Sequence, residues 1–80
     1  MAVNEIDRDY VRLLHQCDMI ESIIAGQKAV GVDETEKKQL VGNIVMMLEL
    51  EAIDDKWETA GKDLSRVNSV AATGRTYWKS

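Results

Sequence analysis

Residues 50–61 have the sequence LEAIDDKWETAG, and the course of the chain through Asp54 and Asp55 decides which helical fold forms. Apolar residues recur here at steps of three and four, which places them on one face of a helix. That face keeps its register beyond Asp55, which favours one unbroken helix over residues 34–72. Its members are Leu50, Ile53, Trp57, Ala60, Leu64, Val67 and Ala71.

A break in this helix is the alternative. Asp55 and Glu58 are spaced as in a capping box that would start a new helix, and Gly61 costs about 1 kcal/mol in a helix interior relative to Ala. The sequence therefore predicts an all-α fold with a single domain over residues 1–80, built as a helical hairpin with a long second helix. A three-helix bundle broken near Asp54-Asp55 stays open.

The first helix is predicted over residues 4–25. Asn4 is a favoured N-cap residue, and Gly26 and Gly31 bracket the end of the helix, because glycine commonly follows a helix. A second helix is predicted to start after Asp33, which is the first residue of a capping box. The apolar face of the first helix consists of Ile6, Tyr10, Leu13, Cys17, Ile20 and Ile24.

The two predicted helices differ in length, so a hairpin would leave apolar surface on the longer arm without a partner. That arm carries Trp57, Leu64 and Val67, which we expect at an interaction surface. In addition, residues 44–48 are apolar on every side, and a helix segment of this kind must be covered on every side. Both features predict self-association.

The length of 80 residues gives a second reason to expect a homo-oligomer. A chain this short buries only roughly 60% of its unfolded surface, so it usually needs disulfides, a metal or another chain for stability. The single cysteine, Cys17, excludes a disulfide within the chain, and the single histidine, His15, excludes a histidine-rich metal site. We expect no metal or other cofactor, and a second chain as the remaining source of stability.

The charges are unevenly distributed around a formal net charge of −4. All 14 acidic residues lie within residues 1–63, whereas residues 64–80 contain Arg66, Arg75 and Lys79 and no acid. An acidic body disfavours nucleic acid as a partner, and binding through the basic end would weaken steeply with salt. The basic end of one chain instead suits the acidic body of another.

The sequence also predicts the compartment. The N-terminus lacks the basic and apolar segments of a signal peptide, and one free thiol fits a reducing environment. The longest apolar run, residues 44–48, is far shorter than the ~20 residues that a membrane-spanning helix needs. We expect a soluble cytoplasmic protein without a membrane partner.

No catalytic constellation is indicated. His15 and Cys17 stand two residues apart on a helix, so their side chains point apart and cannot share a proton. Cys17 belongs to the apolar face, where a free cysteine acts as a small hydrophobic residue. The sequence has no glycine-rich phosphate loop, and its helix carboxylates form a solvated face or an acidic docking patch. We expect no enzymatic activity and no catalytic residue.

Residues 73–80, TGRTYWKS, are predicted as an extended tail beyond a helix-ending glycine. Arg, Tyr and Trp dominate binding hot spots, which makes Arg75, Tyr77 and Trp78 candidate contacts. The tail either folds back on its own helices or inserts into a neighbouring protein. A third alternative is a small-ligand site, where Tyr77 or Trp78 stacks on a base and Arg66 or Arg75 holds a phosphate.

One short segment resembles a known family. Its residues are Asp55-Lys56-Trp57, followed by Ala60-Gly61 and Leu64. It is similar to the opening of the second helix in the hairpin shared by phage proteins that sequester cyclic-nucleotide immune signals. The similarity covers residues 55–64, and the sequence departs from the family's pattern after them. It implies an oligomeric α-hairpin that binds a nucleotide between its subunits.

Small size, an acidic body and the lack of catalytic motifs predict a non-catalytic protein-interaction module that self-associates. An adaptor, inhibitor or assembly factor, of the kind that phages, other viruses and mobile elements encode, fits this description. The predicted interaction residues are Trp57, Leu64, Val67, Arg75, Tyr77 and Trp78. The alternative is an oligomeric nucleotide-type ligand-binding protein, with candidate contacts Arg66, Arg75 and Tyr77.

Overall fold

The computed structural model describes residues 5–26 and 33–80, and the regular structure of these residues is entirely helical. The helices are α1 (Glu5–Ile24), α2 (Glu34–Ala52), α3 (Lys56–Thr59) and α4 (Ser65–Lys79). The prediction of an all-α fold is therefore confirmed. The predicted N-cap Asn4 and the predicted helix-end residue Gly31 lie outside the described residues.

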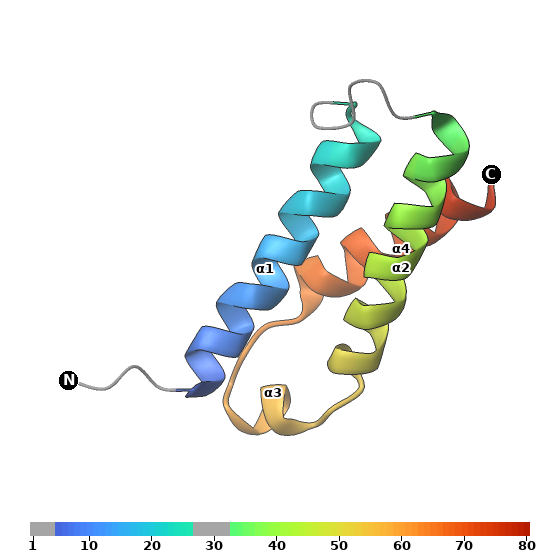
Figure 1. The fold of residues 1–80 in the computed structure, drawn as a ribbon. Coiled ribbons are helices and arrows are strands. Elements are labelled where there is room, and N and C mark those ends of the chain that lie inside the picture. The colour runs from blue at the N-terminus through green and yellow to red at the C-terminus, as the bar shows by residue number, and fades with distance from the viewer. Residues whose placement is uncertain (1–4, 27–32) are drawn as a thin grey trace.

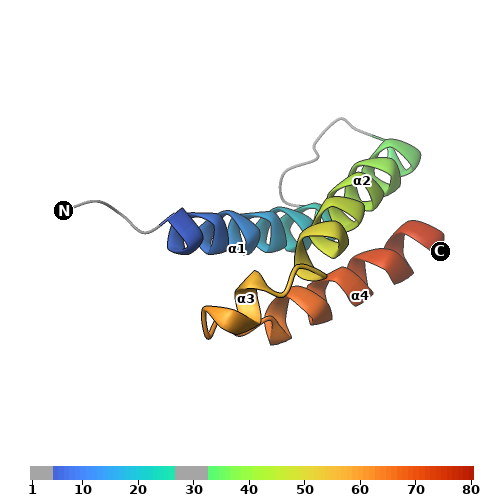
Figure 2. The same ribbon diagram turned by 90° about the horizontal axis from the view of Figure 1, so that it is seen from below.

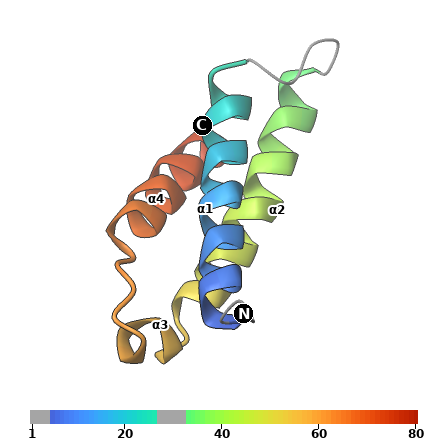
Figure 3. The same ribbon diagram turned by 90° about the vertical axis from the view of Figure 1, so that its left-hand side faces the viewer.

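Helices α1 and α2 form an antiparallel pair, and α4 crosses one face of this pair (Figures 1 and 2). Helix α4 packs against both α1 and α2. The single turn of α3 lies near the end of the pair where α2 finishes, and it leads the chain across to α4 (Figure 3). Among the described helices, no other element covers the face of the pair that is turned away from α4.

The core lies where α4 crosses the α1–α2 pair, and every helix contributes to it. Cys17 of α1, Leu48 of α2 and Val67 of α4 each have an exposed fraction of 0%. The apolar face predicted for the first helix is therefore the face that packs inward. The buried hydrophobic residues are Leu13, Cys17, Ile20, Ile23, Val41, Ile44, Val45, Leu48, Trp57, Val67, Val70 and Ala71.

The predicted unbroken helix over residues 34–72 is wrong. Helix α2 ends at Ala52, and the Asp54 carboxylate accepts a hydrogen bond of 3.0 Å from the backbone N–H of Lys56 as the chain turns into α3. Gly61 then turns the chain again, with a φ of +72° that other residues rarely adopt. The break near Asp54-Asp55, which the sequence left open, is the one that the structure contains.

Trp57 gives the physical reason for the break. Its side chain is fully buried, and its indole Nε1 donates a hydrogen bond of 2.8 Å to the backbone carbonyl of Glu51 in the last turn of α2. The same carbonyl also accepts a hydrogen bond of 3.2 Å from the backbone N–H of Asp54, so the indole is an additional partner at the end of the helix, where carbonyls lack the next helical turn. Folding back also buries Val67, and burial of such a side chain contributes about 1.5–3 kcal/mol, more than a continued helical hydrogen bond would add.

The predicted extended tail over residues 73–80 is also wrong, because α4 continues to Lys79. The expectation took Gly74 as a residue that follows a helix, but Gly74 is buried in the interior of α4. A Cβ atom built on it would lie 2.5 Å from Cγ2 of Val45 and 3.3 Å from Cγ2 of Ile20. Glycine is needed there because two helices approach closely.

Two predicted features of the helix ends are present in the structure. Asp33 is the N-cap of α2, and its carboxylate accepts a hydrogen bond of 2.8 Å from the backbone N–H of Glu36. Gly26 follows α1 with a φ of +77°. Within the described residues, none of the helices combines the length and the apolar character that crossing a membrane would require.

Candidate interaction surface

The predicted interaction residues of the second arm lie in the core of the chain. Trp57 and Val67 are fully buried, and Leu64 is half-buried against the same core. The expectation that these side chains form an exposed stripe is wrong, because the break after α2 lets α3 and α4 cover them. The uncovered length of a hairpin arm therefore gives no reason for self-association.

Arg66 lies against α1. Its guanidinium contacts the carboxylates of Asp18 at 2.5 Å and Glu21 at 2.9 Å. Hydrogen bonds to Asp18 and then Glu21 raise the pKa of Arg66 further above its ordinary value. A phosphate bound by Arg66, as the sequence suggests, would have to compete with both carboxylates for the guanidinium.

Arg75 and Tyr77 attach α4 to α2 at two different points. The guanidinium of Arg75 lies 3.1 Å from the carboxylate of Glu49. The hydroxyl of Tyr77 donates a hydrogen bond of 2.7 Å to the carboxylate of Glu34. That hydrogen bond raises the pKa of the Tyr77 hydroxyl, because the bonded carboxylate favours the protonated phenol.

The structure does not bring the three candidate ligand contacts together. Arg66 and Arg75 are nine residues apart on α4, about 13 Å along the helix at 1.5 Å per residue. Each is paired with carboxylates of a different helix, and Tyr77 is bonded to the first residue of α2. In this structure these side chains fasten α4 to the α1–α2 pair.

Trp78 packs on α2 as well. Its side chain is 39% exposed, and its ring lies over Gly42, where a Cβ atom would meet Cδ1 and Nε1 of the indole at 2.6 Å. The alternatives for the tail are folding back on the chain's own helices, insertion into a neighbour and a small-ligand site. The contacts of Trp78 and Tyr77 correspond to the first.

The segment that resembles the phage proteins has a different conformation here. Residues 55–64 form the short helix α3 and the loop before α4, not the opening of a long second helix. Lys56 lies over the ring of Trp57 with its Nζ 4.7 Å from the ring centroid, and the ring of Tyr10 packs against that of Trp57 with their centroids 6.1 Å apart. Trp57 is thus enclosed by the chain itself.

A different apolar surface is exposed on α2. Among the described residues, eight large hydrophobic side chains are exposed, and five of them belong to α2 or its C-cap. At 3.6 residues per turn, these five lie on the side of α2 opposite the buried Val41, Val45 and Leu48. Their exposed fractions are 45% for Leu40, 56% for Met46, 55% for Met47, 68% for Leu50 and 80% for Ile53.

The exposed Asn43 lies among these five residues, and the six together are called the outer face of α2 below. The sequence predicted that residues 44–48 would need cover on every side. Within the described residues, α1 and α4 cover the side of Ile44, Val45 and Leu48, and nothing covers the outer face. None of the five exposed residues was among the predicted interaction residues, although Leu50 and Ile53 belong to the predicted apolar stripe, and Met46 and Met47 to residues 44–48.

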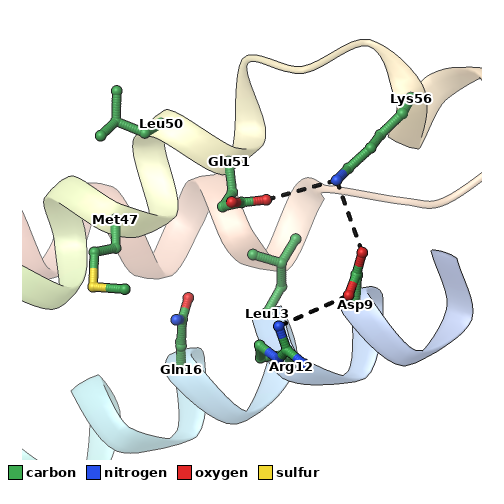
Figure 4. A pocket seen from close by; sticks show the side chains of 8 residues that line it. All are labelled: Asp9, Arg12, Leu13, Gln16, Met47, Leu50, Glu51 and Lys56. Carbon is green, nitrogen blue, oxygen red and sulfur yellow. Dashed lines mark ion pairs between the residues drawn. The ribbon is translucent and has the colours of Figure 1, made fainter. Parts of the chain in front are cut away.

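A shallow hollow adjoins the outer face, between α1 and α2 (Figure 4). Met47 projects from α2 toward Gln16 of α1, and Leu50 borders the same hollow. At its other end, Lys56 lies 3.8 Å from Glu51 and 3.9 Å from Asp9. The flexible side chain of Met47 therefore forms one wall of the hollow, and paired charges form its rim. This arrangement is suited to accept an apolar side chain.

The residues that could carry chemistry are not assembled into a reactive site. Cys17 is fully buried, and this burial raises the pKa of its thiol, which keeps it protonated and unreactive. His15 is exposed on the surface of α1. Among the described residues, no group of three His, Cys, Asp or Glu side chains is arranged to hold a metal ion.

Comparison with known proteins places the chain in no family: no family model, no curated protein and no solved structure matches it.

Proposed function

We propose that this chain is a non-catalytic protein-interaction module whose binding surface is the outer face of α2. One observation carries the proposal: five large apolar side chains, each between 45% and 80% exposed, share one side of a single helix. Contiguous apolar patches on small proteins mark interaction sites. Covering such a patch is favourable, since full burial of each large apolar side chain contributes about 1.5–3 kcal/mol.

The chemistry of the surface supports protein as the partner. Met46 and Met47 occupy its middle, and flexible methionine side chains adapt to surfaces of different shape. The six positions of the outer face carry no charge, so neither a phosphate nor a strongly charged ligand finds a counter-charge there. An adaptor, an inhibitor or an assembly factor of phage or mobile-element type would use such a surface by packing it against a helix or a groove of another chain.

A photo-crosslinking experiment tests this function. A benzophenone side chain is introduced at Leu50 of the full chain in its source cell, and in a control at Ser69, which is exposed on α4. We expect crosslinked protein from position 50 and none from position 69. Equal labelling from both positions, or none from position 50, would contradict the proposal. The mass of the product shows whether the captured chain is another copy of 9.0 kDa or a different protein.

A further inference from the structure

The outer face of α2 has a symmetric spacing along the chain. Its six positions are Leu40, Asn43, Met46, Met47, Leu50 and Ile53. Counted from the midpoint between Met46 and Met47, the positions occur at equal distances in both directions. A surface spaced in this way can pair with itself when two helices run antiparallel, because a two-fold axis then passes through the midpoint.

We infer that a second copy of this chain covers the outer face of α2, with the two α2 helices antiparallel about a two-fold axis between Met46 and Met47. The inference rests on the proposed function of this face and names its partner. In a two-fold interface each contact between two residues occurs twice, so every favourable contact contributes twice to the stability of the dimer.

The pairing places large side chains against large side chains. Met46 faces the partner's Met47 at the axis, and Leu40 faces the partner's Ile53 at each end. Because Met47 borders the hollow beside α1, the partner's Met46 is the side chain that this hollow receives. Asn43, the one polar member of the face, lies opposite the partner's Leu50, so the match is imperfect there.

Charge favours the antiparallel direction. Residues 49–55 at the end of α2 carry Glu49, Glu51, Asp54 and Asp55 and no base. A parallel pair would place these four acids beside the same four in the other copy, at a cost from repulsion. The antiparallel pair places them beside residues 38–44 of the other copy, which contain Lys38 and no acid.

The size of the face fits a dimer. Leu40 and Ile53 are thirteen residues apart, which spans about 20 Å along a helix. A helix-to-helix contact of this length covers the whole outer face, and the adjoining hollow adds to the surface that a second copy can bury. A short chain without an internal disulfide also gains stability from a second copy.

Sedimentation equilibrium of the full chain tests the pairing. We expect a concentration-dependent mass that approaches twice 9.0 kDa. Leu50→Glu should weaken the dimer at least about tenfold, whereas Val11→Glu, at a 50% exposed position of α1 outside this face, should leave it unchanged. Asn43→Leu should tighten it about tenfold, because an apolar side chain then stands at both symmetry-related positions. Unfolding of the Asn43→Leu variant could only weaken the dimer, so a gain in dimer affinity cannot be an effect of misfolding.

Crosslinking of single cysteine variants locates the axis, since the native Cys17 is buried. With a short bismaleimide, Met46→Cys should crosslink to its own copy, whereas Leu40→Cys alone should not. A mixture of Leu40→Cys and Ile53→Cys chains should give the mixed dimer.

A mass of 9.0 kDa at every concentration would overturn the inference, as would self-crosslinking of Leu40→Cys to the same extent as Met46→Cys. If the chain is a monomer while position 50 still crosslinks to another protein in the cell, the proposed function stands and the inferred partner is wrong. If position 50 crosslinks to nothing, both fail.

Discussion

Gly74 lies in the interior of α4 at the point where that helix crosses α2, and it shows how one residue limits the packing of the whole chain. Helix propensity alone would favour Ala there by about 1 kcal/mol. The added methyl group would meet Val45, a stiff β-branched side chain that is itself buried between helices. The two effects have opposite signs, so the substitution distinguishes them.

We expect Gly74→Ala to lower the free energy of unfolding by about 1–3 kcal/mol, the usual cost of overpacking a core. Ser69→Ala, at an exposed position of the same helix, is the matched control and should be neutral or slightly stabilising. Urea denaturation followed by circular dichroism measures both. A stabilised Gly74→Ala variant would show that the helices do not approach this closely.

Asp63 sets the pH dependence of the start of α4. Its carboxylate accepts hydrogen bonds from the hydroxyl of Ser65 at 2.7 Å and from the backbone N–H of Ser65 at 2.9 Å, and these lower the pKa of Asp63. Because its folded pKa lies below the unfolded value, the stabilisation is complete above the ordinary pKa of 3.8 and is lost as pH falls through the folded pKa.

An NMR titration of the Asp63 carboxyl should therefore give a midpoint below 3.8, and Ser65→Ala should move the midpoint upward. Asp63→Asn should remove this contribution to acid sensitivity at the start of α4. An unshifted midpoint in the unchanged chain would mean that the two hydrogen bonds do not form in solution.

At the scale of the elements, the sequence located the helical segments better than their ends. The first helix and the start of the second could be predicted, because apolar spacing and the Asp33 cap are local features. The break after α2 could not, because the stripe of residues 50–71 has the same periodicity whether it continues or folds back. The burial of Trp57 and its bond to Glu51 decide between the two, and both depend on tertiary contacts.

The C-terminal half of α4 provides a prediction at this scale. Deletion of residues 73–80 removes the Gly74 crossing, the Trp78 contact with Gly42 and the Tyr77 bond to Glu34. We expect the melting temperature to fall by more than about 8 °C, since 1 kcal/mol corresponds to about 4–8 °C in a domain of this size. Deletion of Ser80 alone, which removes one hydrogen bond from Lys38, is the control. An unchanged melting temperature after the longer deletion would show that the segment is a free arm.

At the scale of the whole molecule, basic residues of the C-terminal end pair with acidic residues of the same chain. The sequence suggested that the basic end of one chain meets the acidic body of another. In the structure, Arg66 pairs with Asp18 and Glu21, and Arg75 pairs with Glu49. The candidate surface was hard to predict for the same reason: the residues that look most like hot spots hold the fold together, and the exposed ones are ordinary aliphatic side chains.

Self-association through the outer face of α2 should depend on salt differently from self-association through the charged ends of the chain. An interface formed by basic ends and acidic bodies would dissociate as salt rises, because exposed charges are screened beyond a Debye length of about 10 Å at 0.1 M. The outer face of α2 is uncharged, so burial of apolar surface drives its pairing and salt has little effect.

We expect the dimer dissociation constant to change less than about threefold between about 0.05 M and about 0.5 M NaCl, and to fall when sulfate replaces chloride. Sedimentation at each salt concentration measures this. A dimer that weakens steeply with NaCl would instead assign the contact to the charged ends of the molecule.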